Sequence, residues 1–321
     1  MNDTALRAPA YTSTGAFANA PAFTNAEAYS GALRLLPTVL RAGFETLDTA
    51  RRARAEELRL RTGFRPTVVF PDGEISAGET LVTRELLAAT LDIATGASAH
   101  TARDTMRQGF VTARGGYRLG LGGSVATERG EAAGYRALSS IAVRIPREHR
   151  GVAAEAAREI AGGRARSTLI LSPPGVGKTT FLRDLTRIVS DGAPGVKARR
   201  VGLADERGEL ASLHDGVPQL YVGARTDILD GCPKAEAVLI FLRVMNPEVI
   251  ALDEISAPED ARAILLARNC GVALFATAHA AGREDLERKP LYRDLLADGA
   301  FETLVTVEKR DGRRVYRAER L

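Results

Sequence analysis

The sequence predicts an α/β fold in which a mostly parallel sheet, covered by helices, follows a smaller α+β domain. The chain has 321 residues, which suggests about two domains. After residue 150, short aliphatic runs alternate with helical patterns, and this order is typical of parallel sheets. We therefore expect a flexible tail over residues 1–28, an N-terminal α+β domain over 29–150 and an α/β domain over 151–321.

The composition is that of an ordinary soluble protein, with 45% hydrophobic and 26% charged residues. The net charge of +4 is a small excess of arginine, which permits nucleic-acid binding without indicating it. Because Cys232 and Cys270 form no C-x-x-C pair and no secretory segment opens the chain, we expect a reducing cytoplasm. No apolar run approaches the roughly 20 residues that span a bilayer, so a role at a membrane would require a partner.

The elements of the first domain follow from local patterns. Residues 1–28 are rich in Ala, Thr, Asn and Pro and show no periodicity. Helical spacing follows, and two strand-like runs come next at 57–61 and 66–70. A helix over 83–95 is expected to open at Thr83, since threonine is a frequent N-cap.

Glycine is dense between residues 109 and 123, and this segment has two interpretations. Either it presents Arg114 and Arg118 to a phosphate or to a neighbouring subunit, or it is a β-hairpin whose glycines only make tight turns. The spacing favours the second interpretation. A further strand is expected over 139–146, after which the chain links to the second domain.

The second domain alternates strands with helices. Aliphatic runs predict strands at 168–171, 201–204, 249–252 and 273–277, and helical patterns lie near 179–190, 234–245 and 258–269. A final hairpin is expected from residues 304–309 and 315–317. Because ligands bind at the carboxyl ends of the strands in such sheets, polar residues after these runs are site candidates.

The run at 168–171 leads into the most informative motif, a strand, a glycine-bearing turn, Lys-Thr and an apolar-periodic helix. This is the pattern of a P-loop, and its residues are Ser172-Pro173-Pro174-Gly175-Val176-Gly177-Lys178-Thr179-Thr180. Backbone N–H groups and the helix dipole would bind a triphosphate, with Lys178 at the β and γ phosphates and Thr179 in the shell of Mg²⁺. Ser172 departs from the strict motif, which has glycine there. Only five of the 44 basic residues are lysine, so a lysine here indicates a specific need.

A second motif strengthens this interpretation, because the strand over 249–252 ends in Asp253 and Glu254, the Walker B form. Asp253 would hold Mg²⁺, and Glu254 would polarise the attacking water, since phosphoryl transfer depends on placement of charge. An ordinary strand followed by two acids is the alternative. The order of the motifs, with 75 positions (253 − 178) between Lys178 and Asp253, disfavours it. We therefore expect a P-loop NTPase domain of the RecA/AAA-like class that hydrolyses ATP with Mg²⁺.

Other polar residues follow neighbouring strands. Glu206 or Glu209 could orient water or Mg²⁺, and a solvated charged run is the alternative. Thr277 or His279 could sense the γ-phosphate, whereas a structural histidine is the commoner case. Arg225 is a candidate arginine finger that acts across subunits, with a surface salt bridge as its alternative.

Together these motifs resemble the stage III sporulation protein AA family, whose relatives are the ring-forming secretion ATPases. The resemblance covers most of residues 33–321 and rests on segments 57–61, 107–110, 115–123, 172–180, 205–209, 223–235, 246–255 and 277–279. It implies a hexameric ATPase in the mother-cell cytoplasm that serves membrane-embedded channel proteins facing the forespore. It also implies that 205–209 is an acidic box and 277–279 a histidine box.

One position departs from the resemblance. Many secretion ATPases have glycine before the Walker B glutamate, whereas this chain has Asp253, so the acid that orients water remains open.

Two other functions compete with this one. A nucleic-acid-associated ATPase could carry an R-x-x-x-H domain for single strands, but no histidine here has an arginine four residues before it. The preceding positions are Gly96, Ile145, Leu210 and Phe275. A nucleotide-dependent scaffold with little turnover is the other alternative, which the sequence leaves open.

Overall fold

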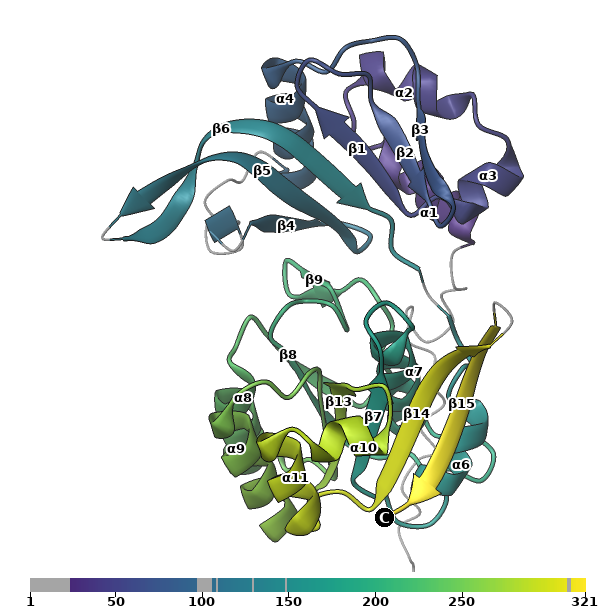
Figure 1. The fold of residues 1–321 in the computed structure, drawn as a ribbon, viewed down its shortest axis with the longest axis vertical. Helices are drawn as coiled ribbons and strands as arrows, with labels where there is room; N and C mark the ends of the chain where they lie inside the picture. Colours follow the sequence, from purple (N-terminus) through teal and green to yellow (C-terminus); the bar gives the residue numbers. More distant parts are fainter. Residues whose placement is uncertain (1–23, 97–105, 108, 129, 148, 311–312) are drawn as a thin grey trace, which may run out of the picture.

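The structure is a computed structural model that describes residues 24–96, 106–107, 109–128, 130–147, 149–310 and 313–321. Two sheets lie one above the other along the long axis of the molecule (Figure 1). The first has six strands in the order β3-β2-β1-β6-β5-β4, and the second has seven in the order β11-β8-β12-β13-β7-β14-β15. A small two-stranded ribbon, β9 (Leu213–His214) with β10 (Val217–Pro218), faces the first sheet from the second.

The first sheet is accompanied by the helices α1 (Asn25–Leu33), α2 (Thr38–Glu45), α3 (Thr49–Arg54) and α4 (Arg84–Thr95). The start of α1 corrects the expected tail over 1–28, since residues 25–28 are helical. The reason is a capping box, in which Thr24 and Glu27 each accept a hydrogen bond from the other's backbone N–H. Residues 1–23 lie outside the described part of the chain. Thr83 caps α4, as predicted.

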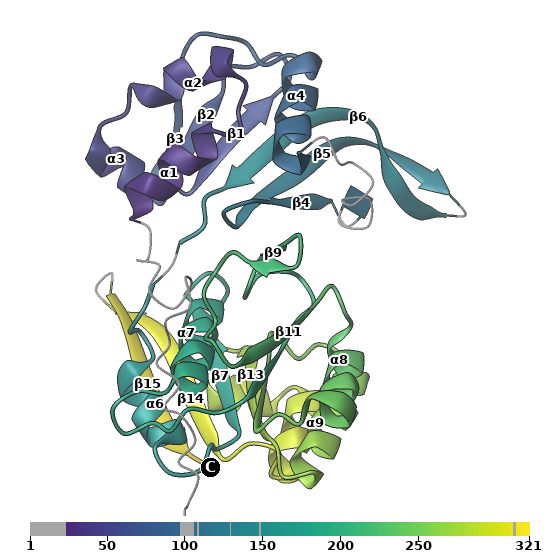
Figure 2. The ribbon, with the colours of Figure 1, turned by 180° about the vertical axis from the view of Figure 1, so that it is seen from behind.

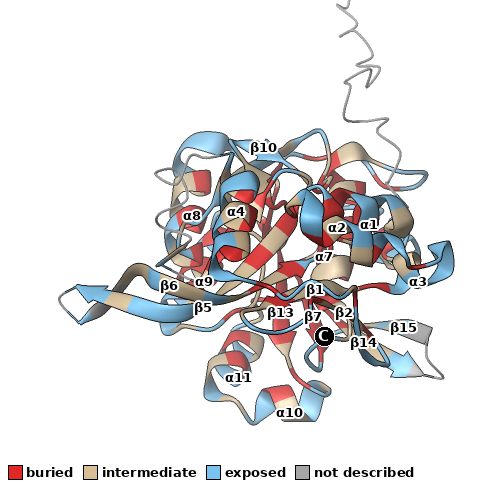
Figure 3. Cartoon of the chain, turned by 90° about the horizontal axis from the view of Figure 1, so that it is seen from above, coloured by how far each residue is buried: buried red, intermediate tan, exposed pale blue. Residues whose placement is uncertain are grey.

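The first sheet is antiparallel throughout, and its strands are β1 (Glu57–Arg61), β2 (Thr67–Phe70), β3 (Gly73–Ser76), β4 (Phe110–Ala113), β5 (Tyr117–Glu128) and β6 (Glu131–Arg144). The glycine-rich segment is a β4–β5 hairpin whose turn contains Gly115 and Gly116, with φ of 91° and 79°. Glycine suits this turn because L side chains rarely adopt such angles, and the hairpin is compatible with both interpretations of the segment. β6 begins eight residues (139 − 131) before the predicted strand, because it continues with β5 into a projecting arm (Figures 1 and 3).

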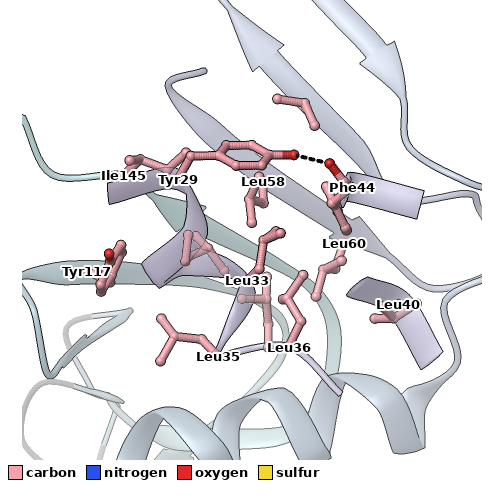
Figure 4. Packing of buried hydrophobic residues seen from close by; sticks show 14 of the residues in the cluster. Tyr29, Leu33, Leu35, Leu36, Leu40, Phe44, Leu58, Leu60, Tyr117 and Ile145 are labelled. Carbon is pink, nitrogen blue, oxygen red and sulfur yellow. Dashed lines mark hydrogen bonds between the residues drawn. The ribbon is translucent and has the colours of Figure 1, made fainter. Parts of the chain in front are cut away.

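The core of this part lies between the helices and one face of the sheet (Figure 4). Two buried tyrosines join the layers by donating hydrogen bonds to backbone carbonyls. Tyr29 donates to the carbonyl of Phe44 at 2.8 Å, and Tyr117 of β5 donates to the carbonyl of Ala28 at 2.8 Å. Their rings therefore fill the core while their hydroxyls keep partners.

The second sheet is largely parallel, with strands β7 (Thr168–Ser172), β8 (Val201–Asp205), β11 (Thr226–Asp230), β12 (Val249–Leu252), β13 (Ala273–His279), β14 (Thr303–Arg310) and β15 (Arg313–Arg320). β15 pairs antiparallel with β14, and the other pairs are parallel. The final hairpin is thus as predicted, although its turn at 311–312 lies outside the described residues. β11 was not predicted, because none of the residues of this edge strand is fully buried and it lacks an aliphatic run.

Helices cover both faces of the second sheet, as Figures 1 and 2 show. One core includes side chains of α6 (Ala154–Ala161) and α7 (Lys178–Asp191). The other includes side chains of α8 (Lys234–Ile240) with its π-helical continuation (Phe241–Met245), α9 (Pro258–Asn269), α10 (Arg283–Glu287) and α11 (Pro290–Ala297). Among the described residues, no helix is long and apolar enough to cross a membrane.

Candidate nucleotide site

The turn between β7 and α7 leaves a helix N-terminus open. Gly175 and Gly177 have φ of 76° and 121°, so glycine lets the chain turn tightly into the helix. Gly177 is the N-cap of α7, and no side chain caps the helix or places an acid in its first turn. The backbone N–H groups of this turn are therefore available to an anion, as a phosphate loop requires.

Three predicted site residues meet beside this turn. The parallel register of β7 and β13 places His279 opposite Ser172. The ammonium of Lys178, which is 9% exposed, lies 2.8 Å from Nε2 of His279, and a carboxylate oxygen of Glu254 lies 3.3 Å from the same nitrogen. The ammonium of Lys178 can only donate, whereas the role of the His279 nitrogen depends on its tautomer.

The loop after β12 is fixed by contacts with three other elements. Buried Thr277 of β13 donates to Oδ1 of Asp253 at 2.7 Å. Asp260 accepts hydrogen bonds from the backbone N–H groups of Ser256 and Ala257 at 3.0 and 3.1 Å. Tyr292 of α11 donates to the carbonyl of Ile255, and burial raises the pKa of its hydroxyl. Asp253 and Glu254 therefore lie on an ordered loop beside His279.

Asp205, at the end of β8, organises the acidic segment. Its carboxylate is 1% exposed and accepts hydrogen bonds from the N–H groups of Glu209, Leu210 and Ala211, at 2.8, 3.1 and 2.8 Å. Burial raises the pKa of Asp205, while these three donors oppose the shift. Sequence reasoning did not single out Asp205. The available signal was a short acid at a strand end, followed by Gly208, since Asp commonly bonds to backbone beyond it in turns.

Glu206 pairs with Lys234, the first residue of α8, whose side chain is 8% exposed. The rarity of lysine in this chain also pointed to Lys234, but sequence reasoning used it only for Lys178. Lys178 and Lys234 are buried, and Lys289 donates to the carbonyl of His279. Three of the chain's five lysines therefore make contacts at this edge of the sheet, whereas arginine supplies most of its other cations.

Glu209 connects the two sheets. Nη1 of Arg118 in β5 lies 2.9 Å from a carboxylate oxygen of Glu209 and donates to the carbonyl of Arg207 at 3.3 Å. The Arg118 guanidinium also stacks 3.8 Å from the centre of the Phe110 ring. Arg114, the other candidate of the hairpin, is exposed.

A cleft of about 560 Å³ opens between the two parts of the molecule. Gly175, Lys178 and Thr179 of the turn line it from the second sheet, together with His279. Arg118 lines it from the first sheet. Charged groups of both sheets thus border one space large enough for a small-molecule ligand.

Arg225 is not brought to this cleft in its own chain. It precedes β11, which runs parallel to β8, so it lies at the opposite edge of the sheet. Its backbone N–H donates to Oγ of Ser190 at 2.8 Å, and its Nη1 donates to the carbonyl of Ser190 at 3.2 Å. Ser190 is twelve residues (190 − 178) along α7 from Lys178, which corresponds to about 18 Å along the helix.

The residues at this edge fit Mg²⁺ by the chemistry of their donors. The hydroxyl of Thr179 and the carboxylate of Asp253 are oxygen donors, which this hard cation prefers. The hydrogen bond from Thr277 orients the Asp253 carboxylate.

A phosphate-type loop at the carboxyl edge of a largely parallel, helix-covered sheet defines a P-loop NTPase fold. The structure is similar to that of the ATPase DotB from Legionella pneumophila, with a TM-score of 0.56, 17% identity and coverage of 84% of this chain and 78% of that one. It is also similar to the pilus retraction motor PilT, with a TM-score of 0.57, 18% identity and coverage of 83% and 79%. The predicted fold class is confirmed by this likeness.

The sequence itself identifies the family. The family described as sporulation stage III, protein AA, matches residues 31–317. Stage III sporulation protein AA of Bacillus subtilis (strain 168) is 34% identical over 281 residues, which are 87% of this chain and 90% of that protein. The chain belongs to the stage III sporulation protein AA family, as the resemblance of its motifs predicted.

Proposed function

We propose that this protein is a Mg²⁺-dependent ATPase that drives or assembles a trans-envelope sporulation channel between mother cell and forespore. The observation that supports it best is the open N-terminus of α7, with Lys178 beside His279 and Glu254. A triphosphate needs several N–H donors and a cation, and its hydrolysis needs an acid near the attacking water. All three lie at one edge of one sheet.

In this proposal the chain binds ATP through the P-loop, residues 172–180. The N–H groups of the turn and of the first turn of α7 bond the phosphates, and Lys178 leaves His279 to contact the β and γ phosphates. Thr179 and Asp253 would hold Mg²⁺, which would neutralise phosphate charge. Thr277 keeps Asp253 oriented through its hydrogen bond.

The hydrolytic step is assigned to Glu254, which orients the attacking water and accepts its hydrogen bond. His279 would sense the γ-phosphate by donating to it from a ring N–H, once Lys178 has left the imidazole for the phosphates. Glu206 and Glu209 are alternative water-orienting acids, but both are held by cations, Lys234 and Arg118. Glu254 is therefore the first choice.

Assembly and location belong to the same proposal. We expect a homo-oligomer, a hexameric ring, in the mother-cell cytoplasm, held at the membrane by channel proteins. A ring would use two different surfaces of each copy, as head-to-tail assembly requires. Static light scattering with and without ATP would test this directly.

Two variants separate catalysis from nucleotide-dependent scaffolding. Lys178→Ala removes the cation at the phosphates, so ATP affinity measured by calorimetry should fall by roughly 100-fold or more. Glu254→Gln keeps the shape of the side chain but removes its charge. It should bind ATP within about threefold of wild type while phosphate release falls by roughly 100-fold or more. Exposed Lys197→Ala is the matched control and should do neither.

The outcomes point in different directions. Wild-type ATP affinity in Lys178→Ala would overturn the P-loop assignment. If wild-type protein binds ATP but releases no phosphate, even with membrane fractions, the scaffold alternative replaces the ATPase. Wild-type turnover in Glu254→Gln would move the catalytic role to Glu206 or Glu209.

A further inference from the structure

The peptide groups of residues 209–211 are held from both sides by two buried charged side chains. The Asp205 carboxylate accepts hydrogen bonds from the N–H groups of all three residues. Arg183 donates to two carbonyls, from Nε to that of Leu210 at 2.7 Å and from Nη2 to that of Glu209 at 2.6 Å. The segment has no regular secondary structure here, so these side chains supply the hydrogen bonds that its backbone groups would otherwise make within a sheet or helix.

Arg183 belongs to the same helix as the P-loop lysine. It lies five residues (183 − 178) after Lys178 on α7, about 7.5 Å further along the helix axis. Arg183 is 9% exposed, and it lines the cleft together with Lys178, Thr179 and Glu209. A change at the start of α7 therefore reaches the acidic segment through one rigid helix and one side chain.

The chemistry of arginine suits this position. Its planar guanidinium directs two donors at two neighbouring carbonyls, whereas the ammonium of lysine is a single centre. A buried guanidinium is costly to place unless its donors are used. The two bonds from Arg183 therefore restrict the position of the Glu209 backbone.

Glu209 is in turn the residue that Arg118 holds. The chain of contacts runs from α7 through Arg183 to the backbone of Glu209, and from the Glu209 carboxylate to Arg118 of the first sheet. The Arg118 guanidinium is also fixed by the carbonyl of Arg207 and by the ring of Phe110. The wall of the cleft formed by the first sheet is thus connected to the P-loop helix.

We propose that Arg183 is a positioning residue that fixes the Glu209 segment against α7 and thereby sets Arg118 at the cleft for ATP turnover. The inference rests on the proposed ATPase function and goes beyond it, because it assigns a role to a residue outside the nucleotide motifs. Arg183 acts through Glu209 and Arg118. Nucleotide binding itself should depend little on it.

The test is a double-mutant cycle on the full-length chain. Arg183→Lys keeps the charge but loses the two-carbonyl contact, so kcat should fall several-fold, by no more than Arg118→Ala lowers it, because Arg183 acts through Arg118. The affinity for a fluorescent ATP analogue should change by less than about threefold. Arg118→Ala should lower kcat several-fold in wild type, yet by less than about twofold when Arg183 is already lysine.

Controls separate positioning from simple loss of stability. Arg183→Met is made alongside, and Arg158→Lys, an exposed arginine of α6, should match wild type in kcat and Tm. A structural defect would lower Tm and would leave the effect of Arg118→Ala unchanged. If Arg183→Met does not fold, the cycle with Arg183→Lys decides the question.

Two results would overturn the inference alone. One is wild-type kcat in Arg183→Lys, and the other is an equal loss from Arg118→Ala in both backgrounds. Absence of hydrolysis by wild-type protein would instead overturn the proposed function, and this inference with it.

Discussion

The two sheets of this protein differ in how their strands are buried. Every residue of β7, β8 and β12 is buried, whereas buried and half-buried residues alternate along β1 and β2. The second sheet has a core on each face, and the first packs its helices and main core against one face. Figure 3 shows the same contrast, with the β5–β6 arm exposed or half-exposed. Parallel sheets generally require cover on both faces.

The difference explains how each sheet contributes to the cleft. The doubly covered sheet holds the ends of its strands rigidly, so the P-loop and the carboxylates emerge at fixed places along one edge. The singly covered sheet has a free face and hairpin turns, from which Arg118 reaches the cleft. Each prediction below tests or refines this contrast.

The largest effect is expected from neighbouring residues in β7. Ile170 and Leu171 are both fully buried but belong to different cores, so replacing either with alanine should cost about 2–5 kcal/mol of unfolding free energy. In β1, Leu60→Ala should cost a similar amount, whereas Arg61→Ala should cost less than about 1 kcal/mol, because its ion pair with Glu74 is partly exposed. Urea unfolding measures all four. A cost below 1 kcal/mol for Leu171→Ala would contradict the two-sided core.

The contact between the sheets gives the next effect. Arg118→Ala removes the ion pair to Glu209 and the bond to Arg207, so turnover of ATP should fall by roughly 3- to 10-fold with little change in Tm. Arg114→Ala is the matched control, because Arg114 is exposed in the same hairpin. Equal effects of the two variants on kcat would show that the contacts of Arg118 with the second sheet do not contribute to turnover.

The carboxyl edge of the second sheet should show a pH effect. Partial desolvation of the Asp230 carboxyl at the exposed end of β11, and then the charge of Asp205, raise the pKa of Asp230 from 3.8 to about 6. The folded chain therefore binds more protons than the unfolded chain between about pH 4 and 6, so this group makes stability fall as pH rises through that window. Asp230→Asn should be more stable than wild type at pH 7 and similar near pH 4.

Thermal unfolding at several pH values checks this prediction. Asp227→Asn, the other exposed acid of the same strand, lies near its beginning and not at its carboxyl end, so it is the control and should leave the pH profile unchanged. A wild-type profile in Asp230→Asn would show that the carboxyl titrates normally.

The smallest effect is expected at the opposite edge. Arg225→Ala loses a bond to the last turn of α7, so stability should fall by about 1 kcal/mol or less, with ATP affinity unchanged. A role in trans gives a different signature. If Arg225 is an arginine finger, turnover of the variant falls as well, and mixing it with Glu254→Gln protein restores activity above the sum of the two.

Much of the fold was predictable because its signals are local. The strands at 168–171, 201–204, 249–252 and 273–277 were found from aliphatic runs, and the structure extends three of them by one or two residues. β11 was missed because this edge strand has no fully buried residue and therefore no hydrophobic run. That omission mattered, since the direction of β11 is what separates Arg225 from the cleft.

The sequence by itself determined the family, the P-loop with its strand and helix, and the placement of Asp253 and Glu254 after a strand, because each depends on residues close together in the chain. Tertiary structure alone decided which cation meets each glutamate of the 205–209 segment. Glu209 pairs with Arg118, 91 residues away, and Glu206 pairs with Lys234, 28 residues away. Such pairs depend on strand order and on the packing of the two sheets. Hydrophobic periodicity identifies the buried face of a strand but carries no information about its neighbours.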